Sequence, residues 1–234
     1  MTMRLAKFLV SALFATAAVT SQASVINVGT DMSVVDTIPG VTGFATTGAQ
    51  MAGLLVTATF SSGFSQTLGW ATTGAQSGGV SGDGWGLSTN GDTFSSLFNY
   101  TVDATRGQLS TLVMNAAGSN QVTLFDTTFG GATGTPGSAT GRTFDIASGC
   151  VSCNVTATYS NVVAVSGNAA VGDLFHVLSL TFVNGTGPTA AFAFRQDIDN
   201  DSRLTTGFVP EPGAVSLLAL GLLAMGGFLR RRVR

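Results

Sequence analysis

The central part of this 234-residue chain contains no lysine and no glutamate. Charged residues make up 9% of the sequence, against about 25% in an average globular domain. Residues 24–208 carry four arginines and eleven aspartates, which gives this region a formal charge of −7. Phosphate binding needs clustered lysine and arginine side chains, so the composition argues against nucleic acid as a partner.

The scarcity of histidine and the lack of a nucleophile motif restrict the enzymatic chemistry available. A Ser-His-Asp arrangement would have to use His176, the only histidine, and no Gly-x-Ser-x-Gly sequence supplies the serine. Strand periodicity aligns His176 with Leu174 and Leu178, which favours a buried structural histidine. Without glutamate, glycosidase-type catalysis would need two aspartates, and no pair stands out among eleven. We therefore predict that the protein is not an enzyme.

Cysteine is also scarce, with Cys150 and Cys153 as the only pair. In an exported protein such a close pair favours a disulfide that closes a tight loop. A redox centre would need a helix after the pair, whereas residues 154–156 continue as a predicted strand. A zinc site would need two further ligands. The sequence favours the disulfide and leaves a redox or metal role as the alternatives.

Residues 1–23 have the features of a secretory signal peptide. A basic region with Arg4 and Lys7 precedes an apolar run at residues 8–19, and small residues lead to Ala23. The apolar run is too short to cross about 30 Å of hydrocarbon. We expect signal peptidase to cleave after Ala23 and the following body, residues 24–208, to be exported.

The C-terminal segment, residues 209–234, combines a rigid tripeptide, an apolar run and a basic cluster. Pro210-Glu211-Pro212 favours extended backbone because each proline fixes φ and restricts its predecessor. Residues 213–229 carry no charge and would span about 25 Å as a helix, near the lower limit for a bilayer. The cluster that follows would hold the C-terminus in the cytoplasm, and it consists of Arg230, Arg231, Arg232 and Arg234.

This arrangement resembles the PEP-CTERM sorting domain, in which Pro-Glu-Pro precedes an apolar helix and an arginine cluster. The resemblance implies a Gram-negative bacterium that makes exopolysaccharide. It also implies an exosortase that recognises Pro210, Glu211 and Pro212 while the helix is in the inner membrane, and then removes the helix. The protein would continue to the cell surface or extracellular matrix. The resemblance does not extend to the body, because this signal is attached to many unrelated bodies.

The body is predicted to be all-β and to form a single β-sandwich or jelly-roll-like domain. Residues 54–62 (LLVTATFSS) alternate between apolar and polar side chains, and residues 173–185 and 189–195 repeat this pattern. Asn184-Gly185 is a turn dipeptide between the last two predicted strands. No stretch of the body has sustained helical periodicity, so we expect one domain flanked by the signal peptide and the C-terminal helix.

An acidic stretch near the end of the body resembles the start of a calcium-binding loop, with carboxylates at alternate positions. Its sixth position is Ser202 rather than glycine, and its twelfth is Phe208 rather than glutamate, so the match is partial. The alternative is a solvated acidic loop paired with nearby arginines. The candidate calcium ligands are Asp197, Asp199 and Asp201.

These observations predict a non-enzymatic surface or matrix protein that acts with exopolysaccharide in a biofilm. A calcium-dependent carbohydrate-binding module is the alternative, and it would need Trp70 or Trp85 exposed for stacking on sugar rings. A secreted hydrolase is the second alternative, and it would need His176 exposed beside aspartate and serine in a wide pocket.

Overall fold

The computed structural model describes residues 24–42, 45–117, 123–129, 134–135 and 141–201. The predicted signal peptide at residues 1–23, the tripeptide Pro210-Glu211-Pro212, the apolar segment 213–229 and the terminal arginines lie outside the described residues. Within the described part, no helix is both long enough and apolar enough to cross a membrane.

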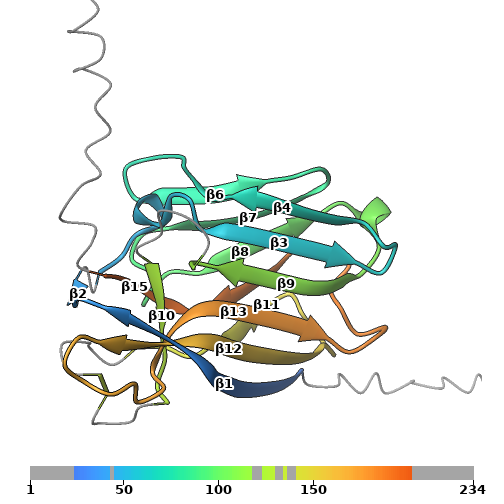
Figure 1. Ribbon diagram of the computed structural model, residues 1–234. Coiled ribbons are helices and arrows are strands. Elements are labelled where there is room, and N and C mark those ends of the chain that lie inside the picture. Colours follow the sequence, from blue (N-terminus) through green and yellow to red (C-terminus); the bar gives the residue numbers. More distant parts are fainter. Residues whose placement is uncertain (1–23, 43–44, 118–122, 130–133, 136–140, 202–234) are drawn as a thin grey trace, which may run out of the picture.

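The larger of two sheets has nine strands in the described part of the chain. Figure 1 shows β4, β3, β9, β13, β12 and β1 following one another across it. β10 pairs with Leu174 and Phe175 at the start of β13, next to the stretch that pairs with β9, and from β10 the order continues through β15 to β2. The bounds are β1 (Val25–Ile38), β2 (Val41–Thr42), β3 (Leu55–Phe60), β4 (Ser65–Gly69), β9 (Leu109–Asn115), β10 (Thr123–Asp126), β12 (Asn154–Val165), β13 (Leu174–Phe182) and β15 (Asp197–Asp201).

The smaller sheet has six strands in the order β11-β14-β8-β7-β6-β5. Its bounds are β5 (Ala71–Thr72), β6 (Ser77–Ser81), β7 (Trp85–Asn90), β8 (Phe98–Val102), β11 (Asp145–Ser148) and β14 (Phe192–Arg195). The helical elements in the described residues are two short 3-10 turns, η1 (Gly48–Met51) and η2 (Ala104–Arg106). The predicted all-β class is confirmed.

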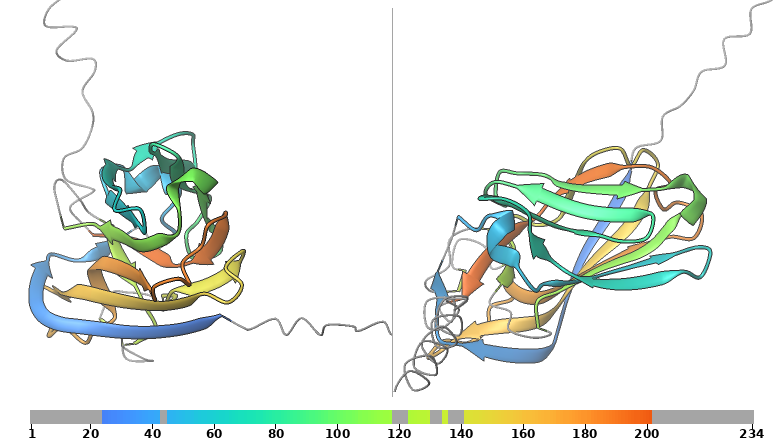
Figure 2. Two further views of the ribbon diagram at one scale, coloured as in Figure 1. Left: turned by 90° about the vertical axis from the view of Figure 1, so that its right-hand side faces the viewer. Right: turned by 90° about the horizontal axis from the view of Figure 1, so that it is seen from above.

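Apolar side chains from both sheets form the main core, so the body is sandwich-like. In β3 the burial alternates strictly, with Val56, Ala58 and Phe60 inside, as the period of two requires. Phe98 on β8 and Phe194 on β14 belong to this core, and their rings stack with centroids 5.2 Å apart. One edge of the larger sheet is β1, which pairs in parallel with β12 and is drawn in blue in Figure 2.

One strand path passes from the smaller sheet to the larger at Gln196. Residues 192–195 form β14 in the smaller sheet, and residues 197–201 form β15 in the larger. Gln196 is buried between them, and its amide donates to the carbonyl oxygens of Asp126 (3.3 Å) and Asp197 (2.8 Å). This corner fixes the start of β15 against β10 and positions the site described next.

Candidate functional site

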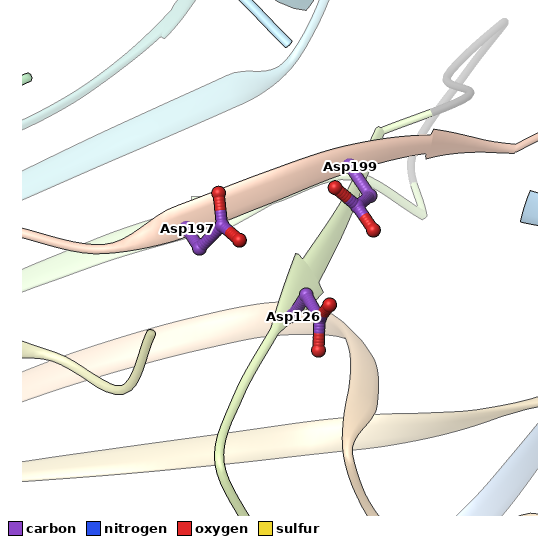
Figure 3. Close-up of side chains that lie close together, drawn as sticks. All are labelled: Asp126, Asp197 and Asp199. Carbon is purple, nitrogen blue, oxygen red and sulfur yellow. The ribbon is translucent and has the colours of Figure 1, made fainter. Parts of the chain in front are cut away.

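Three aspartates from two strands converge beside this corner: Asp126 on β10, with Asp197 and Asp199 on β15 (Figure 3). One carboxylate oxygen from each lies within 4.8 Å of the other two. The antiparallel register places Asp126 opposite Asp197 and Leu124 opposite Asp199. Residues in these positions project from the same face of a sheet, so the pairing itself brings the three carboxylates together. We call them the carboxylate cluster.

The carboxylate cluster is buried, with exposed fractions of 1% for Asp126, 3% for Asp197 and 1% for Asp199. Burial raises the pKa of Asp197 to about 6, although the Thr93 hydroxyl donates a 3.2 Å hydrogen bond to its Oδ1 atom. Burial, together with the charges of Asp126 and Asp197, holds the pKa of Asp199 well above its usual range. Asp197 and Asp199 therefore resist ionisation, as expected for like charges that share a desolvated space.

Backbone contacts brace the cluster from the side of residues 141 and 142. The Arg142 amide donates to the Asp126 carbonyl (3.2 Å), and the Asp197 amide donates to the Arg142 carbonyl (3.1 Å). A Cβ atom on Gly141 would lie 2.4 Å from the Asp126 carbonyl carbon, so only glycine allows this approach. The guanidinium of Arg142 lies over the Phe94 ring, 4.9 Å from its centroid.

A second set of hydrogen bonds supports the corner from the core. The Tyr159 hydroxyl donates to Gln196 Oε1 and accepts a 2.7 Å bond from the Phe144 amide. Because the Gln196 amide in turn donates to Asp126 and Asp197, the tyrosine is connected to the backbone beneath both carboxylates. This fully buried connection holds the two strands of the site in register.

The predicted calcium ligands lie on a strand and do not form the turning loop of the predicted site. Asp197, Asp199 and Asp201 all lie on strand β15 and are all buried, so the alternative of a solvated acidic loop is wrong. Arg195 lies nearest to Asp145, at 3.8 Å, rather than to these aspartates. Asp201 is opposite Val41 on β2 and is not among the converging carboxylates. The third member is Asp126. No local sequence pattern marks this residue, because its place in the cluster depends on the register between β10 and β15.

His176 lies inside the fold and not in an open pocket. It is 2% exposed, and its Nε2 atom lies 2.9 Å from Asp36 Oδ2 on β1. This contact joins β13 to the edge strand across the intervening β12. The hydrolase alternative requires an exposed His176, and His176 is buried.

Both tryptophans are core residues with satisfied indole groups. Trp70 is 2% exposed and donates to the Gly48 carbonyl at 2.8 Å, while Trp85 is 4% exposed and donates to Gln66 Oε1 at 2.9 Å. Neither ring is available for stacking on a sugar. The carbohydrate-binding alternative required an exposed tryptophan for stacking on sugar rings, and neither tryptophan is exposed.

Cys150 and Cys153 form a buried disulfide with Cα atoms 5.4 Å apart. The Val25 amide donates to the Cys153 carbonyl at 2.8 Å, and the Ser24 hydroxyl contacts the Cys150 carbonyl. The disulfide loop thus holds the beginning of β1. A hollow of about 180 Å³ lies beside it, lined by Ser24 and residues 146–151.

Comparison with known families finds the PEP-CTERM protein-sorting motif at residues 208–232. The chain is therefore an exported protein that is sorted by an exosortase and passes through a membrane-anchored stage. The motif covers 25 of 234 residues and does not include the β-sandwich. No curated protein and no solved structure matches the chain.

Proposed function

We propose that this protein is a non-enzymatic structural component of the cell surface or extracellular matrix, where it associates with exopolysaccharide in a biofilm. The observation that carries the proposal is the sorting motif at residues 208–232, which follows the β-sandwich in the sequence. A β-sandwich with its own sorting segment suits a protein that is delivered outside the cell to be displayed rather than to turn over a substrate.

The outer surface of the sandwich supports contact with a hydrated glycan. Strands β3 and β4 carry paired hydroxyls, with Thr57 and Thr67 joined at 2.7 Å and Thr59 and Ser65 joined at 2.9 Å. These hydroxyls lie on the face opposite the buried residues of β3. A neutral face of this kind exchanges hydrogen bonds with water and sugar hydroxyls at little desolvation cost.

The two alternatives receive less support from the same body. His176, Trp70 and Trp85 are buried. A structural role for the body is therefore favoured over either alternative.

The first test is the intact mass of the mature protein from the bacterium that makes it, combined with cell fractionation. Sorting and removal of the helix predict a C-terminus near Glu211 and recovery in the surface or matrix fraction. Glu211→Ala should leave the full-length chain in the inner membrane, whereas Thr206→Ala, outside the motif, should be processed normally. A wild-type chain that still ends at Arg234 and stays in the inner membrane would refute processing.

A second test addresses the exopolysaccharide. In a strain unable to make exopolysaccharide, the processed protein should move from the matrix fraction to the medium, and restored synthesis should return it. Retention of the processed protein in the same fraction without exopolysaccharide would refute the glycan association while leaving the sorting step intact.

A further inference from the structure

We propose that the carboxylate cluster of Asp126, Asp197 and Asp199 is a binding site for one calcium ion that joins β10 to β15. The three oxygens that converge come from strands more than 70 residues apart in the chain, and they lie within 4.8 Å of one another (Figure 3). This site differs from a calcium loop, because its ligands are brought together by strand pairing.

The charge of the cluster requires a counterion or protons. Asp92 adds a further negative charge near Asp197 and Asp199. Arg142 is the cation that favours ionised Asp197, but its guanidinium lies against the Phe94 ring. Asp199 itself forms no ion pair with any described residue. Buried carboxylates that lack a cationic partner are strongly disfavoured, so this arrangement gains most from a bound cation.

The Oδ2 atom of Asp199 gives an independent indication of a ligand. Asp199 is 1% exposed, and this oxygen has no hydrogen-bond partner among the described residues. Its carboxylate points into the space shared with Asp126 (Figure 3). Buried carboxylate oxygens almost always accept hydrogen bonds or bind metals. A cation between the three side chains would provide the missing partner.

The chemistry of the donors selects calcium. All three ligands are carboxylate oxygens, with no histidine or cysteine among them, which favours a hard cation over zinc. Calcium takes six to eight oxygen ligands in flexible geometry, whereas magnesium requires near-octahedral geometry, keeps several waters and usually binds only one or two carboxylates. Three converging carboxylates in a buried space therefore favour calcium over magnesium. The export signal also sends the body away from the cytoplasm.

The test uses the full chain, purified in detergent from a host without exosortase and stripped of metal with EGTA. Equilibrium dialysis with ⁴⁵Ca²⁺ should give one calcium ion per chain. At a hundred times the Kd, calcium should raise the Tm by about 5 °C or more. Magnesium should bind at least about tenfold more weakly.

Asp199→Asn keeps the size of the side chain and removes its charge. This variant should lose the bound calcium and the calcium-dependent rise in Tm, while far-UV circular dichroism shows that it remains folded. Asp103→Asn is the matched control, because Asp103 is exposed and lies outside the cluster. It should bind calcium like the wild type. If Asp199→Asn does not fold, Asp197→Asn replaces it in the same assay.

Three results would overturn the proposal. Folded wild-type chain that binds no calcium at 10 mM would mean that protons alone neutralise the cluster. Calcium binding that is unchanged in the Asp199→Asn and Asp197→Asn variants would place the ion elsewhere. Tighter binding of magnesium than of calcium would contradict the choice of ion.

Discussion

Asp126 and Asp197 face each other directly across the antiparallel strands β10 and β15. Like charges in this position destabilise a sheet, yet both side chains are buried beside Asp199. The strands therefore pair most stably when the carboxyls are protonated or share a cation. This relationship makes the stability of the body sensitive to its solution conditions.

The stability of the metal-free protein should fall as the pH rises. The pKa of Asp197 increases from 3.8 to about 6 in the folded state, so the fold favours the protonated form. Its contribution is complete below about pH 4 and is lost as the pH passes through about 6. The raised pKa of Asp199 extends this loss to higher pH. Urea unfolding in EDTA at pH 5 and pH 7.5 measures the difference, and an equal or greater stability at pH 7.5 would contradict it.

Tyr159→Phe should destabilise the body by about 1–3 kcal/mol, because it leaves buried polar groups at Phe144 and Gln196 without their partner. Tyr100→Phe provides the control. The Tyr100 hydroxyl is buried and has no hydrogen-bond partner in the described part of the protein, so its removal should be neutral or stabilising. Urea denaturation of both variants compares them, and similar losses would show that the Tyr159 bonds contribute nothing specific.

Gly78→Ala should destabilise the body by about 1–3 kcal/mol through overpacking. A Cβ atom at this position would lie 2.1 Å from the Gly48 carbonyl oxygen and 2.2 Å from the Trp70 indole nitrogen. The hydrogen bond between those two groups would be disturbed, so the tryptophan fluorescence should change as well. At Gly69 no heavy atom lies within 4 Å of the corresponding position. Gly69→Ala should therefore be tolerated, and equal thermal shifts for the two variants would refute this explanation.

Replacing both cysteines with alanine should cost about 2 kcal/mol, because the disulfide closes a loop of only a few residues. The loss should be concentrated at the start of β1, whose Val25 amide bonds to Cys153. Amide hydrogen exchange at residues 25–30, compared with that at residues 55–60 of β3, measures this local effect. Uniform loss of protection in both strands would indicate global unfolding instead.

The strands were predictable from the sequence where burial follows a simple alternation, as in residues 54–60. The alternation fails at Asn161, whose φ is +56°. After this residue Val162 joins the main core together with Tyr159, three positions earlier. On the neighbouring β13, Leu178 belongs to the main core but Leu174 belongs to a smaller apolar cluster. His176 between them is buried, as the alternation along this strand predicted.

Only two of the three aspartates of the candidate site could be predicted from the sequence, for a related reason. Asp197 and Asp199 stand out as an acidic repeat, but Asp126 is a single aspartate in a four-residue strand. Its role depends on the register between β10 and β15, which tertiary packing determines. The sorting segment was the opposite case, because its tripeptide, apolar run and arginines are contiguous and need no fold to be recognised.

The position of β15 also determines how the body responds to mechanical load. β15 is hydrogen-bonded to β10 on one side and to β2 on the other. A force applied along β15 would load the hydrogen bonds on both of its sides in shear. Such a force would therefore be opposed by several bonds at once, whereas a strand at an edge can be peeled away one bond at a time.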